Sequence, residues 1–142
     1  MDYEKLKGQV DFNAIAVDAA CSGNPGAMEY QGVYLGYEQR LFHFGPVQGT
    51  NNIGEFLAIV HALALIKKNG WNMKVYSDSI SGMAWVRNKR AKTTLKRDAK
   101  TAQALDLVIR AENWLWQHPE HAQVMKWNTE EWGEIPADFG RK

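Results

Sequence analysis

Hydrophobic and polar positions alternate over short stretches in the first third of the chain, which is typical of β-strands. Residues 12–20 predict a first strand, and the Gly- and Pro-containing segment 22–26 after it predicts a turn. Residues 30–37 and 40–47 predict two further strands, joined by the short polar link of Glu38 and Gln39. The chain is therefore expected to begin with three consecutive antiparallel strands.

From residue 53 to residue 68 the hydrophobic positions recur every three or four residues, which predicts an amphipathic helix. Asn51 or Asn52 is expected to cap its start, and Asn69 with Gly70 its end. Further along, residues 73–77 and 122–127 predict strands, whereas 79–89 and the hydrophobic positions between 105 and 116 predict helices. Residues 128–142 have no clear period.

This order of elements is three strands, a helix, a strand, helices and a last strand. Early antiparallel strands followed by β–α–β units favour a mixed sheet with helices packed on it. We therefore expect an α/β fold, and a length of 142 residues suits a single domain covering residues 1–142.

Composition limits the class of protein. Hydrophobic residues make up 45% and charged residues 23% of the chain, as in ordinary globular domains. No apolar run approaches the roughly 18 residues of a membrane span, and the first residues lack the apolar core of a secretory signal. Cys21 is the single cysteine, so an internal disulfide is excluded. These features favour a cytoplasmic protein without a membrane partner.

Charge is concentrated in one segment. The chain as a whole has a net charge of +1, but residues 87–100 contain seven basic residues and one acid, a local net charge of +6. Such a segment indicates contact with a polyanion. The alternative is a solvated helix face.

Four acidic residues lie where strands and helices begin or end. Asp18 interrupts an apolar strand, Glu55 opens a helix, Asp78 follows a strand, and Asp138 lies in the C-terminal tail. Clustered carboxylates repel one another, and Mg²⁺ relieves this repulsion because it prefers oxygen ligands. Two such ions can hold the attacking water and the leaving oxygen of a phosphodiester. Alternatively, Glu55 and Asp78 are ordinary helix N-terminal acids and Asp138 is a solvated residue.

Four segments together resemble the motifs of type 1 ribonuclease H. They are VDAACSGNPG at residues 17–26, TNNIGE at 50–55, VYSDS at 75–79 and IPADFGRK at 135–142. The resemblance implies a ribonuclease H-like fold with a five-stranded mixed sheet, the first three strands antiparallel and the C-terminal helix short or absent. It also implies a monomeric enzyme that hydrolyses the RNA strand of RNA–DNA hybrids with two Mg²⁺ ions, or Mn²⁺, leaving 5′-phosphate and 3′-hydroxyl ends, and that needs no obligate protein partner.

Carried over to this chain, the resemblance makes Asp18, Glu55, Asp78 and Asp138 the metal-binding and catalytic acids. Many family members have a histidine in a loop before the last aspartate, and residues 126–138 contain none. The tail instead resembles a compact bacterial subgroup with a glutamate four residues before that aspartate, here Glu134. The resemblance implies that this glutamate helps to manage the second metal and product release in place of the loop histidine. The alternative is a solvated loop acid. The separate N-terminal hybrid-binding domain of many subgroup members is not expected.

The resemblance also implies substrate contacts. The RNA strand would meet backbone groups of Cys21 and Gly23, and polar groups of Asn24, Thr50, Asn51 and Asn52, with Thr129 as a weaker candidate. The phosphate of the DNA strand would meet Thr93 and Thr94. The alternative for the asparagines is turn and cap chemistry. Cys21 is not expected to be a nucleophile, since no motif supplies a histidine partner. Trp85 is a candidate for the border of the substrate channel.

Three other functions remain open from the sequence. A catalytically silent hybrid-binding module is disfavoured because all four acids are present. Another nuclease or resolvase of the same superfamily, acting on DNA, is disfavoured by the GNPG and TNN segments. A phosphatase that uses the same acids is the most distant alternative.

Overall fold

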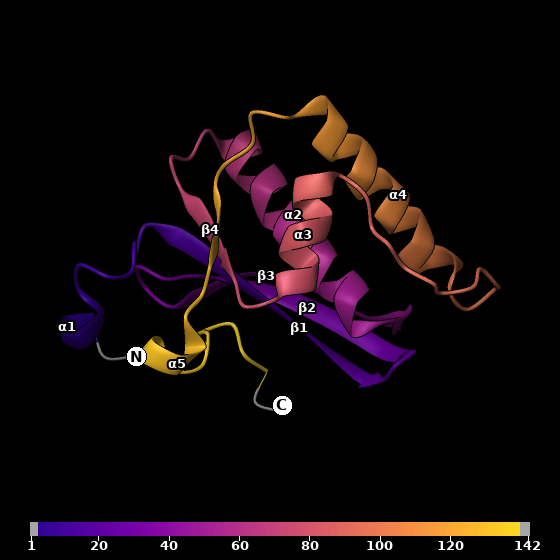
Figure 1. Cartoon of the computed structure of the whole chain (residues 1–142), viewed down its shortest axis with the longest axis horizontal. Coiled ribbons are helices and arrows are strands. Elements are labelled where there is room, and N and C mark those ends of the chain that lie inside the picture. The colour runs from indigo at the N-terminus through magenta and orange to yellow at the C-terminus, as the bar shows by residue number, and fades with distance from the viewer. Residues whose placement is uncertain (1–2, 140–142) are drawn as a thin grey trace.

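The computed structural model describes residues 3–139, which form a five-stranded sheet and five helices (Figure 1). The strands are β1 (Ala14–Gly23), β2 (Gly26–Tyr34), β3 (Gln39–Gly49), β4 (Lys74–Ser77) and β5 (Val124–Lys126). The helices are α1 (Tyr3–Leu6), α2 (Asn51–Asn69), α3 (Ile80–Asn88), α4 (Ala102–Gln117) and α5 (Thr129–Trp132). None of these helices is long and apolar enough to cross a lipid bilayer.

The strand order in the sheet is β3-β2-β1-β4-β5. The pairs β1–β2 and β2–β3 are antiparallel, whereas β4 pairs in parallel with both β1 and β5. The predicted mixed sheet, with its first three strands antiparallel and a short helix near the C-terminal end, is confirmed.

The hairpin between β1 and β2 is longer than predicted. Pairing continues to Ser22 opposite Ala27 and Gly23 opposite Gly26, so only Asn24 and Pro25 remain at the tip. Ending the first strand at residue 20 and starting the second at residue 30 was wrong, because Gly and Pro mark a turn without giving its length. A two-residue loop lets both strands extend to the tip.

Both faces of the sheet are covered. Ile15 and Val17 of β1 belong to a hydrophobic cluster with residues of α2, α3 and α4, whereas Ala14 and Ala16 belong to a second cluster on the other face. In Figure 1 the three longer helices lie above the strands, and α1 and α5 lie below them. Because side chains alternate along a strand, β1 is buried on both faces.

The start of α2 corrects one prediction. Thr50, rather than Asn51 or Asn52, is the N-cap: its backbone is extended and its hydroxyl accepts a hydrogen bond from the N–H of Ile53 at 3.2 Å. The two asparagines already lie in the first helical turn. The predicted C-terminal cap is confirmed, since Gly70 has a φ of 66° and closes the helix.

The segment after β5, which has no period in the sequence, is packed against the sheet. Trp127, Ile135 and Ala137 are buried in the second cluster. The indole N–H of Trp127 donates to the carbonyl of Gly133 at 2.9 Å, and that of Trp132 donates to the side-chain oxygen of Gln9 at 3.1 Å. Residues 140–142, the end of the fourth motif, lie outside the described residues.

Candidate active site

Three of the four predicted acids meet in space. One carboxylate oxygen each from Asp18 on β1, Glu55 on α2 and Asp78 after β4 lie within 4.8 Å of one another. Asp18 and Glu55 are only 0% and 3% exposed, and Asp78 is half-buried. We call these three residues the acid cluster. Buried carboxylates at this separation repel one another strongly, so the cluster is suited to a cation.

Glu55 reaches β1 because α2 lies unusually close to the sheet at Gly54. A Cβ at Gly54 would lie 2.8 Å from the Cβ of Ala19, so only glycine permits this approach. The neighbouring Glu55 then accepts a hydrogen bond from the backbone N–H of Ala19 at 3.1 Å. The β1–β4 pairing includes only residues 14–16 of β1, which leaves this N–H available to the carboxylate.

Asp78 is positioned by the start of α3. Ser79 caps this helix by accepting the N–H of Gly82 at 2.9 Å. A Cβ at Gly82 would lie 3.2 Å from the Cβ of Glu55, so the small residue lets the first turn of α3 approach α2. The connection between β4 and α3 therefore brings Asp78 next to Glu55.

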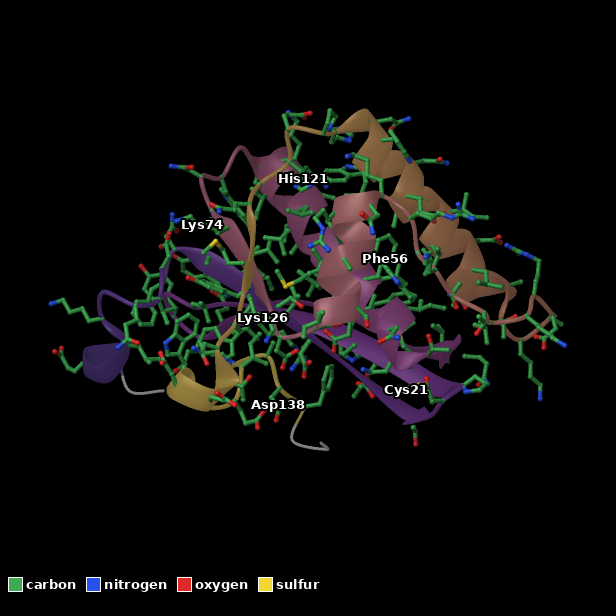
Figure 2. All side chains as sticks on the ribbon, viewed as in Figure 1. Cys21, Phe56, Lys74, His121, Lys126 and Asp138 are labelled. Carbon is green, nitrogen blue, oxygen red and sulfur yellow. The ribbon has the colours of Figure 1, made fainter. Side chains whose placement is uncertain are left out.

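Asp138 lies in the tail that follows α5 (Figure 2). It does not belong to the group whose carboxylate oxygens lie within 4.8 Å of one another. The residue before it, Ala137, is buried, and its carbonyl accepts a hydrogen bond from the side-chain amide of Gln31 on β2. Gln31 is directly opposite Asp18 in the β1–β2 pairing. The tail therefore brings Asp138 to the strand next to the acid cluster.

The donor set fits a hard divalent cation. All four side chains are carboxylates, the ligands that Mg²⁺ and Mn²⁺ prefer, and no thiolate or imidazole belongs to the group found among the described residues. Among residues 3–139, one buried carboxylate oxygen in each of Asp18, Glu55 and Asp138 receives no hydrogen bond from the protein. Carboxylate oxygens of this kind can coordinate a divalent cation.

A cavity of about 600 Å³ opens on the acid cluster. Its lining includes Glu55 and Asp78 together with Cys21 and Asn51. Burial raises the pKa of the Cys21 thiol, and its sulfur lies 3.7 Å from the carbonyl oxygen of Gly49. A raised pKa keeps the thiol protonated at neutral pH, and a protonated thiol is a poor nucleophile.

A second cavity, of about 510 Å³, gathers most of the other candidate substrate residues. Its lining comes from the hairpin tip, the start of α2, α3 and the basic segment, and includes Asn24, Thr50, Asn52, Trp85, Thr93 and Thr94. Lys92, Lys96 and Lys100 line the same cavity. Consecutive residues of the TNN segment line different cavities, Asn51 the first and Asn52 the second, so α2 begins between the two.

The basic segment is a shaped loop rather than a helix, because α3 ends at Asn88 and α4 starts at Ala102. The carboxylate of Asp98 accepts the backbone N–H groups of Thr101 at 2.9 Å and Lys100 at 2.8 Å, which holds its pKa below the usual range. Lys89 is directed elsewhere, since its ammonium lies 5.4 Å from the centre of the exposed Trp116 ring. Thus Lys92, Lys96 and Lys100, rather than Lys89, line the second cavity.

Five candidates line neither cavity: Asp18 and Asp138 among the acids, and Gly23, Thr129 and Glu134. Gly23 lies next to the hairpin tip with a φ of 93°, Thr129 begins α5, and Glu134 is exposed between α5 and Ile135. Sequence reasoning missed Gln48, which lines the second cavity, and Gln31. A polar residue within an apolar strand was the available signal for Gln31, but its partner lies 106 residues away.

The order and direction of the strands are those of a ribonuclease H-like fold. Among solved structures, the chain is similar to LC11-RNase H1, isolated from compost by a metagenomic approach. The TM-score is 0.50 at 19% identity, covering 84% of this chain and 87% of that one, which supports the fold.

Sequence comparisons give the family. The family model described as RNase H matches residues 12–130. The ribonuclease H of Bradyrhizobium sp. strain ORS 278 is 32% identical over an alignment of 129 residues, which covers 78% of this chain and 83% of that protein. The ribonuclease H of Syntrophomonas wolfei is 41% identical over 66 residues, 46% of this chain and 45% of that protein. The chain belongs to the RNase H family and is a ribonuclease H enzyme.

Proposed function

We propose that this ribonuclease H hydrolyses the RNA strand of RNA–DNA hybrids with two divalent cations, leaving 5′-phosphate and 3′-hydroxyl ends. The observation that carries the proposal is the acid cluster, in which three secondary-structure elements bring carboxylate oxygens within 4.8 Å of one another. Mg²⁺ is the proposed ion, with Mn²⁺ as a substitute, because both are bound through oxygen ligands.

The four acids would hold these ions, with Asp138 completing the acid cluster from the tail. When bound, the cations supply an activated water and stabilise the charge on the leaving oxygen. The protein contributes the positions of its carboxylates: the backbone N–H of Ala19 orients Glu55, and the Ser79 cap fixes the turn that carries Asp78. Carboxylates that are already in place lose little conformational freedom when a cation binds.

The two cavities together would hold the hybrid, and the second cavity would meet both strands. The amides of Asn24 and Asn52 and the hydroxyl of Thr50 can pair with a 2′-hydroxyl, the group that distinguishes RNA from DNA. Cys21, Gly23 and Asn51 would add contacts to the RNA strand. Thr93 and Thr94, among the lysines of the second cavity, would bind a phosphate of the DNA strand.

Glu134 and Thr129 have secondary proposed roles. The exposed position of Glu134 between α5 and Ile135 leaves it free to meet solvent and leaving product, which supports a role in product release. Thr129 would contact the RNA strand from the start of α5. The single domain, the monomeric state, the lack of an obligate partner and the cytoplasmic location stay predictions.

A cleavage assay tests the proposal. Labelled RNA–DNA hybrid, RNA duplex, DNA duplex and single strands are incubated with and without Mg²⁺, and the product ends are analysed. We expect cleavage of the hybrid alone, in its RNA strand, only with the metal. Cleavage of the DNA duplex, or cleavage of the hybrid in the presence of a chelator, would contradict the proposal.

Asp78→Asn provides the matched variant, because it removes one charge from the acid cluster and nearly preserves the shape. Activity should fall by about 100-fold or more while hybrid binding is retained. Asp106→Asn, on the exposed face of α4 in an ion pair with Arg97, is the control and should keep full activity. If the two variants are equally active, Asp78 does not bind a required metal.

A further inference from the structure

Three polar side chains form a row across the sheet. Asp18 on β1 is paired with Gln31 on β2, and Gln31 is paired with His43 on β3. Paired residues of adjacent strands project from the same face of a sheet. Because Val17 and Ala19 belong to the cluster beneath α2, the row projects from the opposite face, on which the tail packs.

The tail crosses this row and contacts it on both sides of Asp138. Before Asp138, the carbonyl of Ala137 accepts the hydrogen bond from the side-chain amide of Gln31. After it, the ring of Phe139 meets the ring of His43, with centroids 6.2 Å apart and planes inclined by 60°. His43 is itself held by Glu29, whose carboxylate oxygen lies 2.9 Å from its Nε2.

The backbone around Asp138 has little freedom to move. Ile135 and Ala137 are buried in the second cluster, and the N–H of Asp138 donates to the carbonyl of Ile135 at 2.9 Å. The hydrophobic contacts hold the tail on the sheet, but they do not define its position along the row. A directional hydrogen bond from Gln31 does, because it joins the carbonyl preceding Asp138 to the strand position opposite Asp18.

We propose that Gln31 is a positioning residue for the metal site: its amide sets where the Asp138 carboxylate lies relative to the acid cluster, with His43 as a second anchor through Phe139. This inference rests on the proposed function, in which Asp138 binds the cation. Partners that orient a metal ligand act on metal affinity, and losing one typically weakens that affinity about 10- to 100-fold. A purely structural hydrogen bond would act on stability alone.

The test compares two glutamines that each hold the tail by one hydrogen bond. Gln31→Met keeps the length of the side chain and removes the donor to Ala137. Gln9→Met is the control, because it removes the acceptor of Trp132 and leaves the row intact. For each protein, Mg²⁺ binding without substrate is measured by calorimetry, together with the thermal midpoint with and without Mg²⁺ and the Mg²⁺ dependence of hybrid cleavage.

We expect Gln31→Met to bind Mg²⁺ about 10-fold more weakly and to need correspondingly more Mg²⁺ for half-maximal cleavage. Gln9→Met should lower the metal-free thermal midpoint by about as much as Gln31→Met does. Unlike Gln31→Met, it should keep wild-type Mg²⁺ affinity. If Gln31→Met does not fold, Gln31→Asn replaces it in the test. Asparagine carries the same amide on a shorter side chain. His43→Leu should weaken Mg²⁺ binding in the same direction.

Two results would overturn different conclusions. If wild-type protein neither binds Mg²⁺ nor cleaves the hybrid, the proposed function fails. If wild-type protein does both and the Gln31 variant shares its Mg²⁺ affinity, the positioning role of Gln31 is wrong and its hydrogen bond serves only to hold the tail.

Discussion

The side-chain oxygen of Asn24 accepts a hydrogen bond from the backbone N–H of Asn51, with 3.2 Å between the two atoms. Asn24 is at the tip of the β1–β2 hairpin, and Asn51 is the first residue of α2. This bond joins two segments that are distant in sequence and that both line the candidate substrate cavities. The amide nitrogen of Asn24 remains as a donor for a substrate hydroxyl.

Asn24→Ala is therefore expected to raise KM for the hybrid about 10-fold with a small change in kcat, because the interaction acts in binding. Stability should fall by only about 0.5–1.5 kcal/mol, the usual contribution of one hydrogen bond. Asn24→Asp keeps the acceptor for Asn51 and lacks the donor, so it separates the two roles. Steady-state kinetics with Asn69→Ala as a control, at the far end of α2, checks this; an unchanged KM for Asn24→Ala would contradict it.

The lysines of the second cavity should determine the salt dependence of binding. Each phosphate neutralised by a cationic side chain contributes roughly 0.9 to the slope of log affinity against log salt concentration. Replacing Lys92 and Lys96 with alanine should thus reduce the slope by about 1 to 2. The double variant of Lys67 and Lys68, at the C-terminal end of α2, should keep the wild-type slope. Equal slopes for both double variants would mean that the basic segment, residues 87–100, does not contact phosphates.

His61 should make stability depend on pH. Burial lowers its pKa below the ordinary 6.5, and burial raises the pKa of Tyr30 to about 12, so both groups stay neutral near pH 7. The Tyr30 hydroxyl and Nδ1 of His61 share a hydrogen bond of 2.9 Å. The unfolded chain then takes up a proton near pH 6.5 that the folded protein does not bind. Stability is complete above this pH and is lost as the pH falls from 6.5 through the pKa of the folded state.

Urea unfolding at several pH values between 8 and 5 measures this loss. His61→Gln, which cannot ionise, should show a weaker decrease over the same range, whatever its stability at pH 8. The comparison uses the slope against pH, because the substitution also removes the stacking of Phe42 on the His61 ring. A slope equal to that of the wild type would assign the pH dependence to other groups.

Packing of the tail should contribute substantially to stability. Ile135 is 1% exposed and lies in the second hydrophobic cluster, so Ile135→Ala leaves a cavity. The expected cost is about 2–5 kcal/mol in the free energy of unfolding. Ile80, 75% exposed on α3, is the matched control, and its replacement with alanine should change stability by less than about 0.5 kcal/mol. Similar urea midpoints for the two variants would show that the tail adds little.

The sequence predicted the elements whose local patterns are strong. Long apolar periods placed α2 and α4, and the acid cluster followed from Asp18, Glu55 and Asp78 standing where solvation explained them poorly. Prediction from the sequence failed where the position of a residue depends on partners that are distant in the chain. The cap of α2 was given to the asparagines because cap propensity cannot show that the chain is still extended at Thr50.

The tail and Gln31 illustrate the same limit. The alternation at Ile135 and Ala137 covers too few residues to predict that they are buried. They become core residues because they pack on the sheet face that carries Ala14 and Ala16. The contact of Gln31 with Ala137 depends on strand pairing and tail packing together, and neither is visible in local sequence.

The long separation between Gln31 and Ala137 has a consequence for biosynthesis. A chain that grows from its N-terminal end contains Asp18, Glu55 and Asp78 well before residue 138 has been added, and the bond that anchors the tail closes a loop of 106 residues. Contacts between distant residues form late because closing long loops costs conformational entropy. A nascent chain can thus assemble the acid cluster, but it acquires the fourth carboxylate only as the last segment settles on the sheet.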